Sequence, residues 1–222
     1  AAGVKAKKYR PLRLFSIYKV GRRTHRKILV VDGRICYTGG LGIDERWLGN
    51  ARNTNEWRDT QVRVEGPVAA QMQSIFAENW SFTTGEILAG DDFYPAIPPV
   101  GSIRAQAIKA SRGDSSSRAK MLYYVAIQSA EKSIHLANAY FLPGRKLRRA
   151  LIGAARRGVR VTLLLQGRYE YFMQYHAARP VYGVLLAAGV EIHEYEAGFL
   201  HAKVAVVDGH WATVGSSNLD PL

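Results

Sequence analysis

The sequence is poor in cysteine and has no long apolar run. Cys36 is the single cysteine among 222 residues, so an intrachain disulfide cannot form and a structural zinc site of cysteine and histidine is excluded. Cys36 lies in an apolar, strand-like stretch, which predicts a buried and unreactive thiol. No stretch approaches the roughly 20 apolar residues of a membrane-spanning helix, so none is predicted within these residues.

Acidic residues are also scarce. Lysine and arginine number 31 against 18 aspartates and glutamates, which leaves a formal net charge of +13. A surplus of this size favours an anionic partner, and nucleic acid, an acidic membrane surface and a phosphorylated substrate all fit. A generally basic surface without a specific partner fits as well, because charge alone governs solubility and non-specific binding. Composition does not choose among these.

One stretch occurs twice, and the sequence is organised around it. Residues 25–33 and 201–209 both read H-x-K, then four residues ending in Val-Val, then Asp-Gly. The offset of 201 − 25 = 176 continues beyond the stretch, where Gly39 matches Gly215. A match held in one register indicates an internal duplication, and we expect two similar lobes.

The second half of the sequence alternates between helices and strands. Such alternation indicates a largely parallel sheet covered by helices, so the expected fold class is α/β. The expected helices are 118–131, 145–157 and 174–188, and the expected strands are 133–140, 159–165, 190–195, 203–207 and 211–214.

The first half predicts a hairpin followed by a strand and a helix. Apolar runs at 28–31 and 35–38 flank the first Asp-Gly, which is a strong hairpin signal. Residues 60–65 alternate as a strand, and Pro67 suits the first turn of a helix.

A loop rich in proline and serine, from residue 81 to about 116, separates the halves. We therefore expect a first lobe at 1–100 and a second at 101–222. Compared as repeats, the first lobe lacks the front of its unit and the second lacks the back. We expect the first to be incomplete at its N-terminus and the second at its C-terminus.

The H-x-K spacing pairs a base with a cation. Because side chains alternate faces along a strand, His25 shares a face with Lys27, and His201 with Lys203. Two such pairs suit a phosphodiester, because ammonium groups neutralise its non-bridging oxygens. One imidazole attacks phosphorus, and the other protonates the leaving oxygen and then deprotonates the acceptor. A lone histidine is more simply structural, but two in identical contexts favour catalysis. The lysines supply the positive charge, so we expect no metal and no cofactor.

The loops after the Asp-Gly turns return toward the histidines. A two-residue turn sets His25 opposite Gly40, and His201 opposite Ser216 with Asn218 just beyond. Small residues beside an imidazole leave room for a substrate. Asp32 and Asp208 fall at the turns on the opposite parity, which favours a structural role over a direct contact with their own histidines.

These residues resemble the signature of the phospholipase D superfamily, H-x-K-x(4)-D-x(6)-G-S-x-N, which usually occurs twice. The second copy matches throughout, at His201, Lys203, Asp208, Gly215, Ser216 and Asn218. The first matches at His25, Lys27, Asp32 and Gly39, and departs with Gly40 for Ser and Gly42 for Asn. Within the superfamily the chain resembles the bacterial cardiolipin synthases, in segments spread from end to end. The matching segments are 39–43, 57–59, 63–67, 138–143 and 213–221.

The resemblance implies two phospholipase D-like lobes related by a pseudo-twofold axis, each a mostly parallel sheet flanked by helices, with the active site at the lobe interface. It implies a phosphatidyltransferase that moves a phosphatidyl group from phosphatidylglycerol or a related phospholipid to an alcohol through a phosphohistidine. The implied catalytic residues are His25, Lys27, Asp32, His201, Lys203 and Asp208. The residues implied to bind the substrate phosphate are Gly40, Ser216 and Asn218. We assign His25 as the nucleophile and His201 as acid and base, and the reverse assignment stays open.

The same motif also serves enzymes that hydrolyse phospholipids or nucleic acid. A nuclease is the main rival and would account for the positive charge, and a non-catalytic relative is a third reading. The cardiolipin synthase-like segments favour lipid. We therefore expect an anionic phospholipid substrate, peripheral association with the cytoplasmic side of the bacterial inner membrane, and no protein partner. The basic helix at 145–157 either faces anionic lipid or is solvated.

Overall fold

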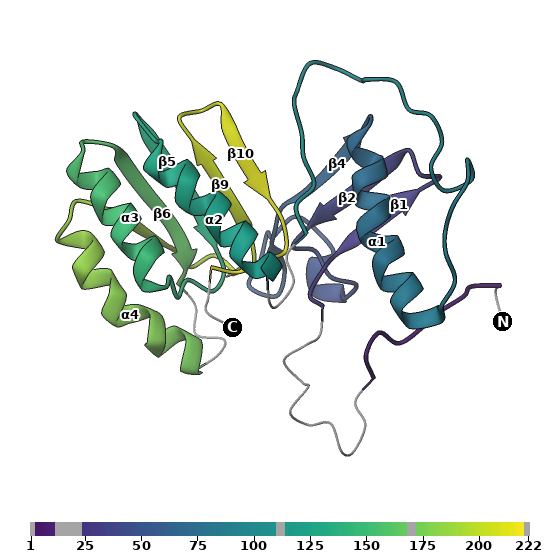
Figure 1. Ribbon diagram of the computed structural model, residues 1–222. Helices are drawn as coiled ribbons and strands as arrows, with labels where there is room; N and C mark the ends of the chain where they lie inside the picture. Colours follow the sequence, from purple (N-terminus) through teal and green to yellow (C-terminus); the bar gives the residue numbers. More distant parts are fainter. Residues whose placement is uncertain (1–2, 12–23, 110–113, 168–171, 220–222) are drawn as a thin grey trace. The chain divides into compact units, whose positions relative to one another are not determined.

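The structure is a computed structural model that describes residues 3–11, 24–109, 114–167 and 172–219 (Figure 1). Its contacts divide the chain into two compact units. Unit 1 consists of residues 1–37 and 63–116, and unit 2 consists of residues 38–62 and 117–222. The segment 38–62, which follows the first H-x-K stretch, thus groups with the second half of the sequence. The fold class is α/β, as predicted, with strands and helices in both units.

Unit 1 is built on a three-stranded sheet of order β1-β2-β4, with the helix α1 against β1. The strands are β1 (Ile28–Val31), β2 (Ile35–Gly39) and β4 (Gln61–Glu65), and α1 spans Val68–Thr84. The predicted hairpin is confirmed, but three residues, 32–34, separate its strands rather than two, and within this loop Arg34 N donates to Val31 O at 3.0 Å. Asp32 and Gly33 both have positive φ, the conformation of a type I′ turn.

The core of unit 1 lies between this sheet and α1. Cys36 is fully buried and packs with Ala69 and Met72 of α1. Burial raises the pKa of the Cys36 thiol, which keeps it protonated. The predicted burial of Cys36 is confirmed.

Unit 2 is built on a five-stranded sheet of order β10-β9-β5-β6-β7. β5, β6 and β7 run parallel, and the hairpin β9–β10 adds two antiparallel strands beside β5. The strands are β5 (Ser133–Asn138), β6 (Arg160–Gln166), β7 (Glu191–Tyr195), β9 (Lys203–Val207) and β10 (Trp211–Val214). All five lie within about two residues of the predicted strands.

The helices of unit 2 are α2 (Asp114–Gln128), α3 (Arg145–Arg156) and α4 (Phe172–Leu186). They lie along one face of the sheet in Figure 1. Successive right-handed crossovers through α3 and α4 place both helices on the same face. The core between helices and sheet is aliphatic, with Ile134, Leu151, Val161 and Leu163 fully buried. The strand residues among them occupy the inward-facing, alternate positions of β5 and β6, and Leu151 lies on the buried face of α3.

Two short elements from distant parts of the sequence also pair within unit 2. β3 (Trp57–Arg58) lies parallel to β8 (Phe199–Leu200), with Trp57 opposite Phe199 and Arg58 opposite Leu200. A 3₁₀ turn, η2 (Glu45–Trp47), precedes β3 and contacts it. Among the helices in the described ranges, no candidate combines the length and apolarity that crossing a membrane would need.

The second hairpin differs from the prediction by one residue. His210 N donates to Val207 O at 3.2 Å, but the ladder pairs Val207 with Trp211. The loop therefore holds one residue more than the two-residue turn, and the predicted placement of His201 opposite Ser216 was wrong. Gly215 instead lies beside Lys203, where its N–H donates to the Lys203 carbonyl at 3.2 Å.

The last arginine of the basic stretch 145–157 has a structural role. Arg157 Nη2 lies 3.2 Å from Ile127 O, 3.1 Å from Gln128 O and 3.4 Å from Ala130 O. The carbonyls of Ile127 and Gln128 belong to the C-terminal end of α2, where helical acceptors are left over, and Ala130 lies two residues beyond it. Arg156 and Arg157 are both exposed residues, but the guanidinium of Arg157 caps α2.

We predict that Arg157→Ala lowers the free energy of unfolding by about 1–2 kcal/mol, because the carbonyls at the end of α2 lose a charged donor. Arg156→Ala is the matched control on the same helix, with an expected change within about 0.5 kcal/mol. Urea denaturation of both variants measures the difference. Equal effects of the two substitutions would contradict the capping role.

Candidate active site

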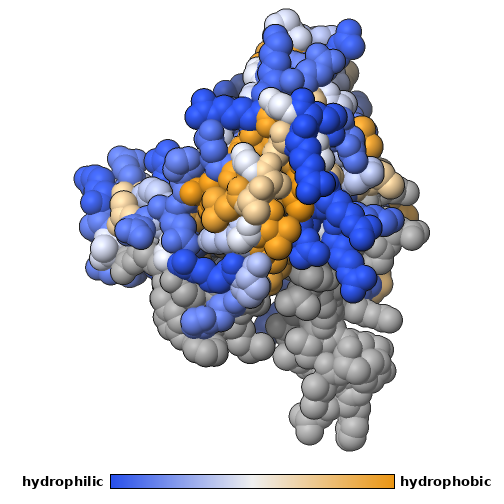
Figure 2. Space-filling view, turned by 90° about the vertical axis from the view of Figure 1, so that its left-hand side faces the viewer, coloured by the Kyte–Doolittle hydropathy of each residue, from blue (hydrophilic) through white to orange (hydrophobic). Residues whose placement is uncertain are grey.

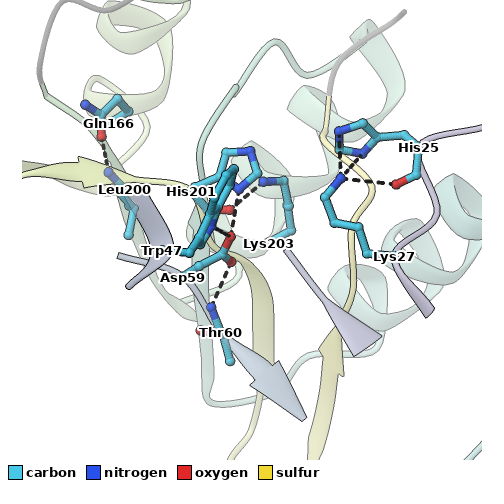
Figure 3. Close-up of polar contacts among 9 residues, drawn as sticks. All are labelled: His25, Lys27, Trp47, Asp59, Thr60, Gln166, Leu200, His201 and Lys203. Carbon is cyan, nitrogen blue, oxygen red and sulfur yellow. Dashed lines mark hydrogen bonds and ion pairs between the residues drawn. The ribbon is translucent and has the colours of Figure 1, made fainter. Parts of the chain in front are cut away.

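The second H-x-K stretch contains a buried histidine–aspartate pair. His201 Nδ1 lies 2.7 Å from Asp59 Oδ2, and both side chains are almost fully buried (Figure 3). Asp59 accepts two further hydrogen bonds, from Trp47 Nε1 at 3.1 Å and from Thr60 N at 2.8 Å. A buried carboxylate is costly unless several donors satisfy it, and here three donors do. Since Nδ1 faces Asp59, Nε2 is the nitrogen through which the ring can attack or exchange a proton.

The pairing of β3 with β8 brings these residues together across 142 positions of sequence. His201 N donates to Arg58 O at 2.7 Å, which continues the ladder by one residue. On the other side of β8, Leu200 N donates to Gln166 Oε1 (Figure 3). His201 is therefore held by its backbone as well as by its ring.

Aromatic rings surround the imidazole of His201. The ring centroids of Trp57 and Trp47 lie 5.3 and 5.5 Å from it, and those of Phe199 and Tyr140 lie 6.1 and 6.3 Å away. Trp47 also donates to Asp59, so one indole contacts both members of the pair. Rings this close exclude water and strengthen the hydrogen bond between imidazole and carboxylate.

Glycines of the first-copy loop make room for this pair. A Cβ at Gly40 would overlap both carboxylate oxygens of Asp59, and a Cβ at Gly42 would lie 2.9 Å from the Trp47 ring. Gly40 N also donates to Thr60 O at 3.2 Å. The two positions where the first copy departs from the superfamily signature are thus those that pack against Asp59 and Trp47. This packing is a physical reason for both departures.

Lys203 lies at the start of β9 and is 1 % exposed. Its Nζ donates to the carbonyl of His201, so the ammonium is held next to the backbone of the residue that carries the imidazole. Gly215 N donates to Lys203 O and starts the loop that carries Ser216 and Asn218. The side chains of Ser216 and Asn218 are partly buried, and Asn218 Oδ1 is buried without a hydrogen-bond partner among the described residues.

Asp208 connects the turn of the second hairpin to the start of β5 through hydrogen bonds. Its carboxylate accepts backbone N–H groups of Glu131, Lys132 and Ser133 at 2.9, 2.8 and 2.8 Å. These backbone donors lower the pKa of Asp208 to about 2. The structural role favoured by its parity is therefore supported, and its carboxylate points to backbone rather than to His201.

The first H-x-K stretch is more open. Lys27 Nζ lies 3.0 Å from His25 Nε2 and 3.4 Å from Nδ1, so base and cation lie together, as their spacing predicts (Figure 3). His25 is exposed and precedes β1, just as His201 precedes β9. Asp32 occupies the turn and is exposed.

The sequence pointed to the histidines and lysines of both copies but missed Asp59 and Trp47. Trp57-Arg58-Asp59 is one of the segments that resemble cardiolipin synthases, yet nothing in the segment alone indicates a contact with His201. A polar residue in that segment, between an alternating strand and a loop, was the one available signal.

We predict that Gly40→Ala disrupts the His201–Asp59 pair. The added methyl displaces the carboxylate, which should lower the free energy of unfolding by about 1–3 kcal/mol and reduce any activity that depends on His201. Gly144→Ala is the matched control, because a Cβ there meets nothing within 4 Å. Thermal unfolding and activity of both variants test this. A Gly40→Ala protein as stable and active as the control would contradict the close packing.

We predict a pH-dependent loss of stability for Asp208→Asn. The folded pKa of about 2 lies below the usual 3.8, so the carboxylate stabilises the fold above about pH 4, and this contribution disappears as the pH falls toward 2. The unmodified chain should exceed Asp208→Asn in stability at pH 6, with a gap that narrows toward pH 2. Asp32→Asn, at the exposed equivalent turn, is the comparison variant. Denaturation midpoints at several pH values measure both, and a gap independent of pH would contradict this role of Asp208.

Comparison with known proteins agrees with this site. The family model described as "Cardiolipin synthase, PLD-like domain" matches residues 123–222. A cardiolipin synthase of Geobacillus kaustophilus (strain HTA426) is 39% identical over 223 residues, covering 99% of this chain and 44% of the relative. A probable cardiolipin synthase, YwiE, of Bacillus subtilis (strain 168) is 34% identical over 220 residues, with the same shares.

The chain spans less than half the length of the curated relatives it matches. The similarity nevertheless extends over nearly all of this chain and includes both H-x-K copies. These matches and the duplicated motif place the chain in the phospholipase D superfamily, where it is most like the bacterial cardiolipin synthases.

Proposed function

We propose that the chain is the core of a cardiolipin synthase-like phosphatidyltransferase. It transfers a phosphatidyl group from phosphatidylglycerol or a related phospholipid to an alcohol acceptor, through a phosphohistidine. The observation that carries the proposal is the pair of H-x-K sites whose histidines have opposite electrostatic partners, a lysine for His25 and an aspartate for His201. The names of the similar proteins support the choice of lipid.

The two partners divide the chemistry. An ammonium beside an imidazole favours the neutral ring, which is the nucleophilic form, so Lys27 suits His25 to attack. A carboxylate beside an imidazole favours the imidazolium, so Asp59 suits His201 to act as an acid. This asymmetry supports His25 as the nucleophile and His201 as acid and base.

The reaction proceeds in two displacements. In the first, a ring nitrogen of His25 bonds to phosphorus, the bond to the leaving alcohol breaks, and His201 gives its proton to the departing oxygen. In the second, His201 takes the proton of the acceptor hydroxyl, whose oxygen bonds to phosphorus as the bond to His25 breaks. Lys27 and Lys203 neutralise the non-bridging oxygens, and Ser216 and Asn218 donate hydrogen bonds to them. In this scheme Gly40 contributes space for Asp59 rather than a phosphate contact.

Peripheral binding to an anionic membrane surface fits the outer features of unit 2. The helix α3 exposes Arg145, Lys146 and Arg149 and contains no acidic residue. On the side where α3 and α4 lie, apolar residues gather in an area bordered by hydrophilic ones (Figure 2). Val184 and Leu186 of α4 are exposed apolar residues. Cations beside exposed aliphatic side chains suit the cytoplasmic face of a bacterial inner membrane, where each charge contributes about 1 kcal/mol.

We predict that the chain converts phosphatidylglycerol vesicles to cardiolipin or phosphatidic acid and leaves plasmid DNA intact. DNA cleavage without lipid turnover would instead identify a nuclease, which the net charge of +13 would also suit. His25→Ala and His201→Ala should each reduce lipid turnover by about 10²–10⁴-fold or more. His135→Ala, an exposed histidine of β5, is the matched control with unchanged turnover.

The same variants test the division of roles. With a p-nitrophenyl ester of phosphatidic acid, whose leaving group needs no protonation, His201→Ala should still form the covalent adduct and accumulate it on His25. Mass spectrometry of the intact chain and its peptides detects this adduct. An adduct on His201, formed in the His25→Ala protein, would reverse the assignment, and near-normal turnover by either variant would rule out the two-histidine scheme.

A further inference from the structure

Asn138 is buried at the end of β5, beside the second H-x-K stretch. It is 1 % exposed and lies opposite Lys203 in the antiparallel pairing of β5 with β9. Residues opposite each other in such a pair point to the same face, with Cβ atoms about 4.5–5.5 Å apart. Asn138 is therefore a close neighbour of the buried ammonium.

The hydrogen bonds of Asn138 orient its amide. Leu219 N lies 3.4 Å from Asn138 Oδ1. Because a backbone N–H can only donate, the side-chain oxygen of Asn138 faces Leu219 and its NH₂ faces away. That Nδ2 atom is buried without a hydrogen-bond partner in the part of the chain that the structure describes.

The same short segment holds the motif loop in place. Leu142 N donates to Leu219 O at 3.0 Å, and Phe141 forms a parallel bridge with Leu219. Asn218, which immediately precedes Leu219, also has a buried atom, Oδ1, that lacks a hydrogen-bond partner within the described ranges. A buried donor of Asn138 and a buried acceptor of Asn218 thus flank one anchored stretch of backbone. Buried polar atoms in folded proteins are normally hydrogen-bonded, so Asn138 Nδ2 and Asn218 Oδ1 are both expected to find a partner in the working state of the site.

We propose that Asn138 is a positioning residue for Asn218. When a phosphodiester is bound, Asn138 Nδ2 donates to Asn218 Oδ1, and this bond turns the amide nitrogen of Asn218 toward the phosphate. The proposal rests on the proposed function, in which Asn218 donates to a phosphate oxygen. Phosphate oxygens only accept, whereas a side-chain amide has an accepting end and a donating end. A donor that occupies the accepting end decides which end the substrate meets.

Asn138→Asp separates this role from that of a structural anchor. The aspartate has the same shape and keeps an oxygen for Leu219 N–H, but it replaces the NH₂ with a second acceptor. It should draw the NH₂ of Asn218 toward itself and leave the oxygen of Asn218 facing the phosphate. An anchor that only accepts from Leu219 would tolerate the change.

Orthovanadate, a phosphate analogue, is the probe, and tryptophan fluorescence is the readout, because Trp47 and Trp57 lie within 5.5 Å of the His201 ring. Asn138→Asp should weaken vanadate binding by about 10-fold to 100-fold, the scale of a lost hydrogen bond to a charged group. Its unfolding midpoint should fall, because the buried carboxylate has one backbone donor, so vanadate binding is compared well below that midpoint. His135→Asp is the matched control, because it places the same charge at an exposed position of the same strand.

The double-mutant cycle with Asn218→Ala gives the decisive comparison. If Asn138 acts through Asn218, Asn138→Asp causes no further loss in the Asn218→Ala background. A full additional loss there would show that the aspartate acts on Lys203 or on the fold, and would overturn the proposal. Failure of the folded, unmodified chain to bind vanadate would overturn the proposed function together with this inference, whereas binding with additive losses would overturn the inference alone.

A second measurement does not depend on the folding of the aspartate variant. In ¹⁵N-labelled unmodified chain, the side-chain amide protons of Asn138 should shift downfield when vanadate binds, because one of them becomes hydrogen-bonded. The shift should be absent in Asn218→Ala. Unchanged Asn138 resonances in the vanadate-bound chain would contradict the proposal.

Discussion

The hydrogen bond between Asp59 and His201 is the interaction around which the site of unit 2 is built. A carboxylate buried to this degree needs donors on both oxygens and space for its two atoms. Trp47 and Thr60 supply the further donors, and Gly40 supplies the space. The segment 38–62 therefore packs as part of unit 2, although it follows the first motif copy in sequence. Its glycines, which look like losses from the superfamily signature, are what this packing requires.

Two stretches with nearly the same letters have become two different environments. His25 is exposed and touches an ammonium, whereas His201 is buried against a carboxylate and enclosed by aromatic rings. The mechanism that we propose would use this asymmetry, because nucleophilic attack and proton donation need opposite protonation states. The motif aspartate of the second copy, Asp208, has a structural role. Its carboxylate accepts hydrogen bonds from three backbone N–H groups, and these bonds hold in place the hairpin that carries Lys203.

Much of the local structure could be predicted from the sequence. The Asp-Gly pairs, the alternating runs and the helical stripes are encoded within a few residues, and nearly every strand and helix lies close to its expected range. The hairpin loops were the local exception, since each holds three residues between its strands, and the extra residue shifted the pairing in the second hairpin. Asn138 belongs to a segment that resembles cardiolipin synthases, so the sequence singled it out. That its buried amide nitrogen lacks a hydrogen-bond partner among the described residues became apparent only from the structure around Leu219 and Asn218.

The sequence by itself determined the duplication, the α/β class, the two H-x-K pairs and the superfamily resemblance, because each of these is written in composition, periodicity or spacing. Only the tertiary structure decided which residue holds His201, which glycines are needed, and that Asp208 connects the second hairpin to β5. The physical reason is distance along the chain. Asp59 and His201 are 142 positions apart, and their contact depends on β3 pairing with β8 and on a buried space of the right size. No local pattern encodes such a contact, because it arises when separate elements pack together.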